Sequence, residues 1–284
     1  MTIAYWNERY EPLETLMVPV EDRAFYFGDA VYEVIKVYGR KLWLLAEHAQ
    51  RLRESLQKIA ITTVDVDRIV TDCLQNVAEN QVENGLVYVQ VSRGTAPRNH
   101  AFPANARANV LIYSKETQDI WAPFRGTGIK VTLEPEIRWQ RRDIKTVNLL
   151  ANCLAKQQAE SQGAQEAIFV EADGTITEAS ANNVFIVKEG VIRTAPAGPQ
   201  ILDGVTRRYV LSVAQRLGFK TETRAFSKAD LLAADEVFIT GTSSEVLGVS
   251  HADGKPVGKG GAKVVRSLRE AFTADVKAFA AAAD

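Results

Sequence analysis

The hydrophobic pattern of the first third of the chain changes its period, and this change limits the folds that the chain can adopt. Residues 31–37 are rich in β-branched and aromatic side chains, which is typical of a strand, and Gly39-Arg40 is a turn from which residues 41–45 return as the second arm of a hairpin. Over residues 46–60, leucine and isoleucine recur at helical spacing with charged residues between them. Strands followed by amphipathic helices predict an α+β fold.

The same alternation continues and defines two predicted domains. Residues 65–79 form a second amphipathic helix with an acidic start, and residues 85–91 and 109–113 are strands, so the first domain covers residues 1–115. Residues 116–127 have no sustained periodicity and form the predicted linker. A larger second domain covers residues 128–284, with strands at 129–133, 167–171, 175–178, 183–187, 191–193, 219–223 and 236–240 and helices at 147–162, 205–217 and 260–282.

Composition excludes several classes of function. The formal net charge of the 284 residues is −1 and shows no basic patch, so we expect neither nucleic acid nor a membrane surface as a partner. The opening MTIAYWNERYEPLETLM has no apolar core of a secretion signal, and no apolar run approaches the roughly 18 residues that span a bilayer. Two distant cysteines and three histidines make a metal centre unexpected. We therefore expect a cytoplasmic protein without a metal.

One lysine lies where a nucleophilic amine is useful. Lys145 precedes Thr146, a good N-cap for the predicted helix, and the positive end of a helix dipole disfavours the ammonium form. A neutral amine suits Schiff-base chemistry. The alternative is a surface lysine near a helix start, and this segment alone favours that alternative.

A glutamate and two small-residue loops in the second predicted domain could bind a phosphorylated pyridine cofactor. Glu178 ends a hairpin strand, from which a carboxylate can pair with a protonated pyridine nitrogen. The loops at residues 201–207 and 240–245 offer the backbone N–H groups that bind phosphate. Taken alone, each is more simply a solvated glutamate, a capped helix or a turn.

A Gly/Pro-rich loop at residues 91–103 presents two cationic side chains. Arg98 and His100 are two residues apart, so they can face one point, and a guanidinium with an imidazole suits a carboxylate. The alternative, in which Arg98 caps carbonyl groups and His100 lies on the surface, is equally compatible with the residues alone.

Together these segments resemble the D-amino acid aminotransferases, which are pyridoxal-phosphate enzymes of fold type IV. The resemblance covers nearly the whole chain and rests on the run at 26–38, Arg-Gly-Thr-x-Pro-Arg-x-His at 93–100, Asp-Ile-Lys at 143–145, Thr-Glu-x-Ser at 177–180, and the glycine loops at 204 and 241. It implies an α+β fold of two α/β domains with pyridoxal 5'-phosphate between them. It also implies a homodimer.

The resemblance assigns roles to individual residues. Lys145 would carry the cofactor as a Schiff base and move the proton at the substrate Cα, and Glu178 would pair with the pyridine nitrogen. Tyr32, Arg98 and His100 would hold the substrate α-carboxylate, and Arg98 and His100 would come from the partner subunit. Binding of the carboxylate by the loop of Arg98 and His100 would select D-amino acids. The remaining cofactor-binding residues would be Arg51, Ser180, Asn182, Val205, Thr206, Gly241 and Thr242.

The expected reaction is the transfer of an amino group from a D-amino acid such as D-alanine to a 2-oxo acid such as 2-oxoglutarate. The chain departs from the family at Arg142, Ala181 and Asn182, which leaves the side-chain preference open. Alternatives of the same fold are a branched-chain L-amino acid aminotransferase, an (R)-amine transaminase and aminodeoxychorismate lyase. A non-catalytic binding protein that kept the fold is the alternative from another class.

Overall fold

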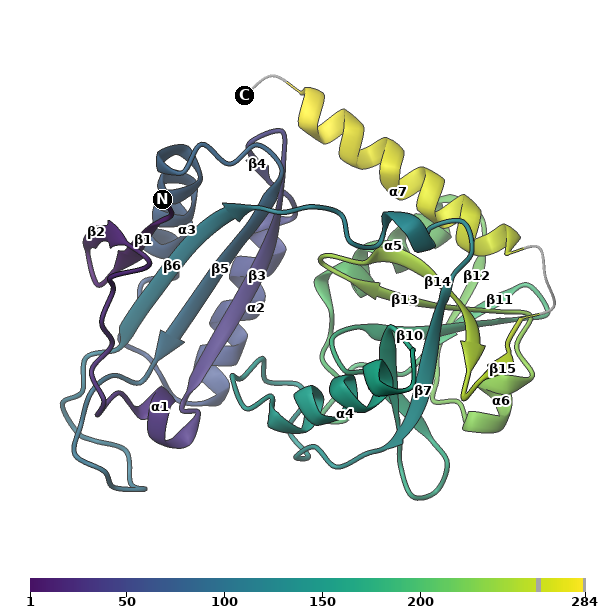
Figure 1. The fold of residues 1–284 in the computed structure, drawn as a ribbon, viewed down its shortest axis with the longest axis horizontal. Helices are drawn as coiled ribbons and strands as arrows, with labels where there is room; N and C mark the ends of the chain where they lie inside the picture. The colour runs from purple at the N-terminus through teal and green to yellow at the C-terminus, as the bar shows by residue number, and fades with distance from the viewer. Residues whose placement is uncertain (259–261, 283–284) are drawn as a thin grey trace. The chain divides into compact units, whose positions relative to one another are not determined.

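The computed structural model describes residues 1–258 and 262–282, and the chain divides into two compact units (Figure 1). The first unit consists of residues 1–118 and 144–148 together with the end of the chain from residue 278. The second consists of residues 119–143 and 149–277. The short segment 144–148 thus belongs with residues that lie far before it in sequence.

The first unit is an antiparallel six-stranded sheet with two long helices on one face (Figure 1). The strand order is β2-β1-β6-β5-β3-β4. Its elements are β1 (Ile3–Trp6), β2 (Arg9–Pro12), α1 (Arg23–Phe27), β3 (Ala30–Tyr38), β4 (Lys41–Leu42), α2 (Leu45–Lys58), α3 (Val66–Glu79), β5 (Gly85–Ser92) and β6 (Asn109–Glu116).

Strand β3 shows why the sequence folds in this way. Val31, Ile35 and Val37 are buried in the core beneath the helices, whereas the alternate residues Tyr32 and Lys36 are partly exposed on the other face. One covered face and one open face are what an alternating strand of an antiparallel sheet requires. The predicted hairpin and the two predicted helices are confirmed.

The acidic start of the second helix is also confirmed. Asp65 is the N-cap of α3, and its carboxylate accepts hydrogen bonds from the backbone N–H groups of Asp67 (2.9 Å) and Arg68 (3.2 Å). These two N–H groups have no partner within the helix, so the side chain satisfies them.

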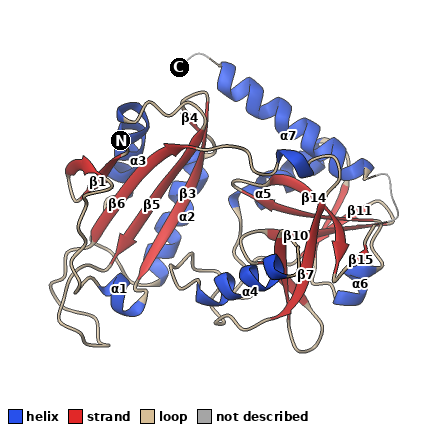
Figure 2. Cartoon of the chain, viewed as in Figure 1, coloured by secondary structure: helices blue, strands red, loops and turns tan. Residues whose placement is uncertain are grey.

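The second unit is built on a nine-stranded mixed sheet, whose strands are coloured red in Figure 2. Strand β7 pairs in parallel with β8 and with β14, and β11 pairs in parallel with β12. The elements are η1 (Ala122–Phe124), β7 (Ile129–Pro135), α4 (Leu150–Ser161), β8 (Glu166–Val170), β9 (Ile176–Ala179), β10 (Asn183–Lys188), β11 (Val191–Thr194), α5 (Val205–Arg216), β12 (Lys220–Thr223), α6 (Lys228–Leu232), β13 (Glu236–Gly241), β14 (Glu245–Ala252), β15 (Lys255–Pro256) and α7 (Lys263–Ala281).

The predicted helix at residues 147–162 starts later than expected. Helix α4 begins at Leu150 and has Leu149 as its N-cap, so the prediction that Thr146 caps it is wrong. The backbone of the preceding segment is instead hydrogen-bonded beside strand β3, where Thr146 forms a bridge with Val31. Those hydrogen bonds compete with helix formation, so the helix begins only after this segment.

Several elements of the structure were not predicted from the sequence. Strands β1, β2, β14 and β15 and helices α1 and α6 were not predicted. The predicted helix at 260–282 is α7, although residues 260 and 261 lie outside the described part of the chain. Within the described residues, no helix is both long enough and apolar enough to cross a membrane.

Candidate functional site

Lys145 lies in the first unit on an extended segment beside β3. The backbone N–H of Tyr32 donates to the carbonyl of Lys145 (3.0 Å), and the N–H of Val147 donates to the carbonyl of Ala30 (3.2 Å). The Nζ of Lys145 lies 4.2 Å from the centroid of the Tyr32 ring. Strand pairing, rather than a helix start, therefore fixes the position of this amine against a tyrosine.

A buried ion cluster lies under the same strand. Glu33 accepts hydrogen bonds from Arg51 Nε (2.7 Å) and Nη2 (2.8 Å), and from Nδ1 of His48 (2.8 Å). Burial alone would raise the pKa of Glu33, but Arg51 and His48 outweigh burial and hold this pKa well below its ordinary value. Burial lowers the pKa of His48, and Lys145 adds to that lowering, so the amine lies within electrostatic range of this cluster.

The loop after β5 holds two cationic side chains against one ring. Arg98 lies over the Phe27 ring with its Cζ 5.2 Å from the centroid, and the His100 ring lies 5.3 Å from the same ring. The loop is anchored by Arg93, which donates to Asp29 (2.7 and 3.0 Å). Within the described residues, neither Arg98 nor His100 makes a side-chain hydrogen bond or ion pair. Both side chains are therefore available to a further anion.

Glu178, in the second unit, is a buried carboxylate with three donors. Arg138 Nη1 donates to Oε1 (2.7 Å), while Asn183 Nδ2 (3.1 Å) and the backbone N–H of Leu202 (3.0 Å) donate to Oε2. Burial raises the pKa of Glu178, and Arg138 opposes that rise. A carboxylate has about four lone-pair sites, so one remains for a further donor.

Asn182 connects two neighbouring parts of the second unit. Its Nδ2 donates to Glu166 Oε2 (2.6 Å), and its Oδ1 accepts a hydrogen bond from Ser244 Oγ. Ser180 Oγ donates to the other oxygen of Glu166. A Cβ at Gly241 would lie 2.3 Å from Asn182 Oδ1, so glycine is required for this close approach. This network fixes the loop that follows β13.

The start of α5 lies against the same part of the sheet. Gly204 is its N-cap and provides no side-chain hydrogen bond, so the first N–H groups of the helix, from Val205 and Thr206, have no side-chain cap. A Cβ at Gly204 would lie 2.1 Å from Asn183 Oδ1, and Asn183 pairs with Thr240 across β10 and β13. The two glycine loops are thereby attached to adjacent strand ends.

Comparison with known proteins identifies the family. The model for amino-transferase class IV matches residues 30–252. This chain belongs to the class IV aminotransferases. Its sequence is 38% identical over 263 residues to the D-alanine aminotransferase of Bacillus licheniformis, covering 90% of each chain. It is 36% identical over 276 residues to the D-alanine aminotransferase of Staphylococcus epidermidis, covering 96% of this chain and 97% of the relative.

Solved structures of aminotransferases share the fold. The branched-chain amino acid aminotransferase of Escherichia coli superposes with a TM-score of 0.88 at 26% identity, over 96% of this chain and 93% of that one. A second branched-chain amino acid aminotransferase, solved with pyridoxamine 5'-phosphate, gives a TM-score of 0.88 at 26% identity, over 97% of this chain and 94% of that one. The predicted α+β fold of type IV is confirmed, and so is the prediction of a pyridoxal-phosphate-dependent aminotransferase.

The second unit of this aminotransferase fits a phosphorylated pyridine. An uncapped helix start at Gly204 and the tight glycine loop at Gly241 offer backbone N–H groups, which bind phosphate. The Oγ1 of Thr240, next to that loop, is buried and has no hydrogen-bond partner among the described residues. Glu178 retains one acceptor site for a pyridinium N–H. The residues present therefore match the donor and acceptor groups of pyridoxal 5'-phosphate.

The structure places the predicted site residues in three groups. Tyr32 and Lys145 are in contact in the first unit, and Arg51 is held there by Glu33. Arg98 and His100 share the Phe27 ring, and no contact among the described residues joins them to Tyr32. The third group lies in the second unit and consists of Glu178, Ser180, Asn182, Val205, Thr206, Gly241 and Thr242.

The sequence analysis missed the charged partners of these residues. Arg138 binds Glu178, and Glu33 binds Arg51. Glu33 had a visible signal, because it occupies an inward-facing position of an alternating strand, where a charge requires a buried partner. Arg138 lies in a segment without periodicity and gave no such signal. Arg142 is buried and donates to the carbonyls of Trp139 (2.9 Å) and Gln200 (3.1 Å), so this departure from the family serves as a structural link.

Proposed function

We propose that this aminotransferase transfers the amino group of a D-amino acid, such as D-alanine, to a 2-oxo acid, such as 2-oxoglutarate. D-Alanine aminotransferases are 36–39% identical to the chain, while the branched-chain enzymes that share its fold are 26% identical. One geometric observation supports a site for the substrate carboxylate in the loop whose sequence resembles that of the D-amino acid aminotransferases. Arg98 and His100 lie side by side on Phe27 without an anionic partner in the described chain, as a site for an α-carboxylate requires.

We propose that Lys145 binds the aldehyde carbon of pyridoxal 5'-phosphate covalently between turnovers. When bound, the cofactor supplies an electron sink for the charge that remains on the substrate Cα after its proton leaves. Lys145 would take this proton from the substrate Cα as a general base and, as a general acid, would give it to the carbon that receives the amino group. Tyr32, whose ring contacts the Lys145 amine, limits where that amine can move.

We propose that Glu178 accepts a hydrogen bond from the protonated pyridine nitrogen. Its pairing with Arg138 supports this role, because the guanidinium favours the ionised carboxylate and opposes the rise in pKa that burial causes. An ionised Glu178 stabilises the protonated ring. The phosphate would be held by Arg51, Val205, Thr206, Gly241 and Thr242, and Ser180 and Asn182 would position the surrounding loops.

The proposed substrate site has one further requirement. We propose that Tyr32, Arg98 and His100 meet across a homodimer, with Arg98 and His100 supplied by the partner subunit, as the resemblance to the D-amino acid aminotransferases implies. We also propose a cytoplasmic location, which suits Cys73 and Cys153 as free thiols.

A branched-chain L-amino acid aminotransferase is the second candidate, because the superposition on such enzymes covers nearly the whole chain. The two candidates use the same lysine and cofactor and differ in the face of the substrate that the lysine reaches. The handedness of the amino donor therefore distinguishes them.

Replacing the lysine tests the proposed chemistry. We expect Lys145→Ala to abolish both turnover and the visible absorbance that covalent attachment gives the cofactor. Lys115→Ala, which removes an exposed lysine of the first unit, is the control and should retain both properties. Turnover and visible absorbance in Lys145→Ala equal to those of the wild type would contradict the assignment.

A further inference from the structure

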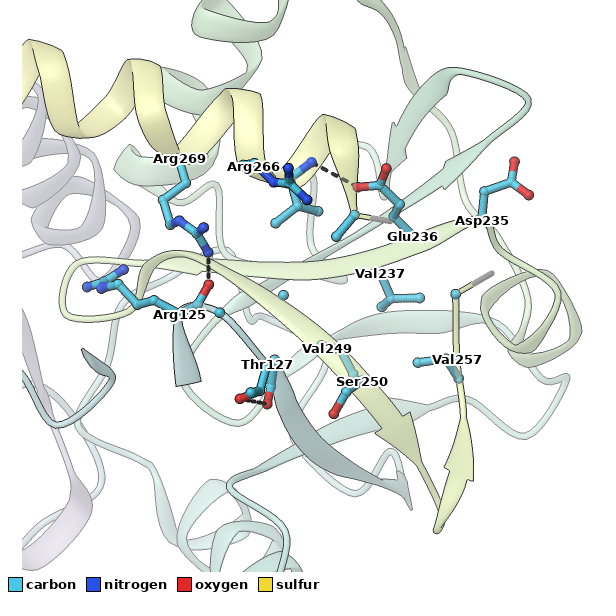
Figure 3. A pocket seen from close by; sticks show the side chains of 16 residues that line it. Arg125, Thr127, Asp235, Glu236, Val237, Val249, Ser250, Val257, Arg266 and Arg269 are labelled. Atoms are coloured by element: carbon cyan, nitrogen blue, oxygen red, sulfur yellow. Dashed lines mark hydrogen bonds between the residues drawn. The ribbon is translucent and has the colours of Figure 1, made fainter. Parts of the chain in front are cut away.

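A cavity lies within the second unit, between helix α7 and strands β13 and β14 (Figure 3). Its volume is about 330 Å³, which lies at the lower end of the range for small-molecule sites. The lining combines arginines at one end with valines along the strands. The residues used below are Arg125, Arg266, Arg269, Val237, Val249 and Val257.

Two of the three arginines form no ion pair within the part of the chain that the structure describes. Arg125 pairs with Asp119 (3.1 Å) and Glu245 (3.0 Å), so its charge is compensated. Arg266 and Arg269 form no ion pair with any residue that the structure describes. Arg269 points from α7 toward Arg125 and donates to its backbone carbonyl (Figure 3). Burial and the neighbouring Arg125 and Arg266 lower the pKa of Arg269, and Glu270 opposes that lowering.

The acidic residues of the lining accept hydrogen bonds from backbone N–H groups, and Glu236 lies next to Arg266 in the view of Figure 3. The two carboxylate oxygens of Glu236 accept hydrogen bonds from the backbone N–H groups of Val264 (3.0 Å) and Val265 (2.9 Å) at the start of α7. Asp235 accepts a hydrogen bond from the N–H of Glu189 (2.7 Å). These contacts direct carboxylate oxygens of both residues to backbone N–H groups, and in the described part of the chain neither residue forms an ion pair with Arg266 or Arg269.

Two guanidinium groups that form no ion pair among the described residues indicate the class of ligand. Arg266 and Arg269 are three residues apart on α7, so their side chains leave the same face of the helix. Together they carry two positive charges, which match the roughly −1.5 to −2 of a phosphate monoester better than the single charge of a carboxylate. Planar guanidinium groups also bind phosphate oxygens in pairs.

We propose that this cavity binds a small phosphate monoester, with its phosphoryl group held by Arg266 and Arg269 and its apolar part lying against Val237, Val249 and Val257. The site is separate from the proposed cofactor site, since it is lined by none of the residues proposed to hold pyridoxal 5'-phosphate. Glu236 begins β13 and lies about 16 Å along the strand from Gly241, while Arg269 lies nearer the turn after Gly241, because it contacts Arg125, which pairs with Glu245.

Calorimetric titration of the holoenzyme with phenyl phosphate tests this proposal. The visible absorbance of the bound cofactor is recorded during the titration and should stay constant, which shows that the probe does not displace the cofactor. We expect Arg266→Gln and Arg269→Gln each to weaken binding about tenfold or more, since each removes a charge-assisted contact. Inorganic phosphate and benzoate should bind more weakly than phenyl phosphate, because each lacks one part of the proposed ligand.

Lys277→Gln is the matched control, because it removes one positive charge from an exposed position of the same helix that does not line the cavity. It should bind phenyl phosphate as the wild type does. Arg266 is exposed, so its variant is expected to fold, which thermal unfolding checks. The proposal is wrong if both arginine variants bind as the wild type does, if the wild type does not bind at millimolar concentration, or if binding reduces the cofactor absorbance. Its failure would leave the proposed transamination untouched.

Discussion

A single methyl group at Gly241 tests whether the loop after β13 holds the cofactor phosphate. In Gly241→Ala the new Cβ would lie 2.3 Å from Asn182 Oδ1 and 2.9 Å from Ser244 Oγ. Ordinary contacts begin at 3.4 Å, so the Asn182 side chain must move by about an ångström. That movement would weaken the hydrogen bond from Asn182 to Glu166. We therefore expect the loop that follows β13 to shift as well.

The expected cost follows from overpacking. Adding a carbon atom to a well-packed site costs about 1–3 kcal/mol. If the loop holds the phosphate, this cost appears largely in cofactor binding and weakens the affinity for pyridoxal 5'-phosphate by about 5-fold to 150-fold. The assay removes the cofactor from the protein and follows the return of visible absorbance as pyridoxal 5'-phosphate is added back.

Two further variants make this prediction specific. Gly126→Ala adds the same methyl group in the same unit at a position with no atom within 4 Å, and it should leave the affinity unchanged. Asn182→Ser in the Gly241→Ala background shortens the opposing side chain and should restore part of the lost affinity. Cofactor affinity of Gly241→Ala within twofold of the wild type would refute the reasoning.

Two other predictions concern the first unit. Glu33→Gln leaves the Arg51 guanidinium buried without its anion, so unfolding by urea at pH 7 should show a loss of about 3–5 kcal/mol. The folded-state pKa of Glu33 is lowered, so the stability that Glu33 contributes is complete above its unfolded pKa of 4.5 and is lost as the pH falls further. The difference in the free energy of unfolding between Glu33→Gln and the wild type should therefore shrink only below pH 4.5. A constant difference down to pH 3 would contradict this prediction. Arg98→Ala should raise KM for D-alanine about tenfold to a hundredfold while leaving cofactor affinity unchanged, and unchanged steady-state kinetics would assign the carboxylate to other residues.

The sequence predicted those parts of the fold that depend on local pattern. Strand β3 alternates between buried and open faces, and Asp65 caps α3 by a local hydrogen bond, so both could be read from neighbouring residues. The start of α4 could not, because the backbone of residues 145–147 bonds to strand β3, more than 100 residues earlier. Propensity within a segment carries no information about such a partner.

The candidate site, like the fold, could be predicted from the sequence only where neighbouring residues determine it. Lys145 was found through a helix-start argument that proved wrong, and its place in the site rests on the family resemblance and on its contact with Tyr32. Arg98 and His100 share a loop, so spacing alone could predict that they face one point. The pairing of Glu178 with Arg138, 40 residues away, depends on the tertiary fold and was not predictable from spacing.

The central claim is that this class IV aminotransferase acts on D-amino acids, and one half-reaction measurement tests it most directly. The purified holoenzyme is mixed with D-alanine or with L-alanine, without a 2-oxo acid, and the visible absorbance of the bound cofactor is followed. We predict that D-alanine converts the cofactor to its aminated form, with loss of that absorbance and release of pyruvate, while L-alanine leaves the spectrum unchanged. Conversion by L-alanine alone, or by neither isomer, would contradict the proposed function.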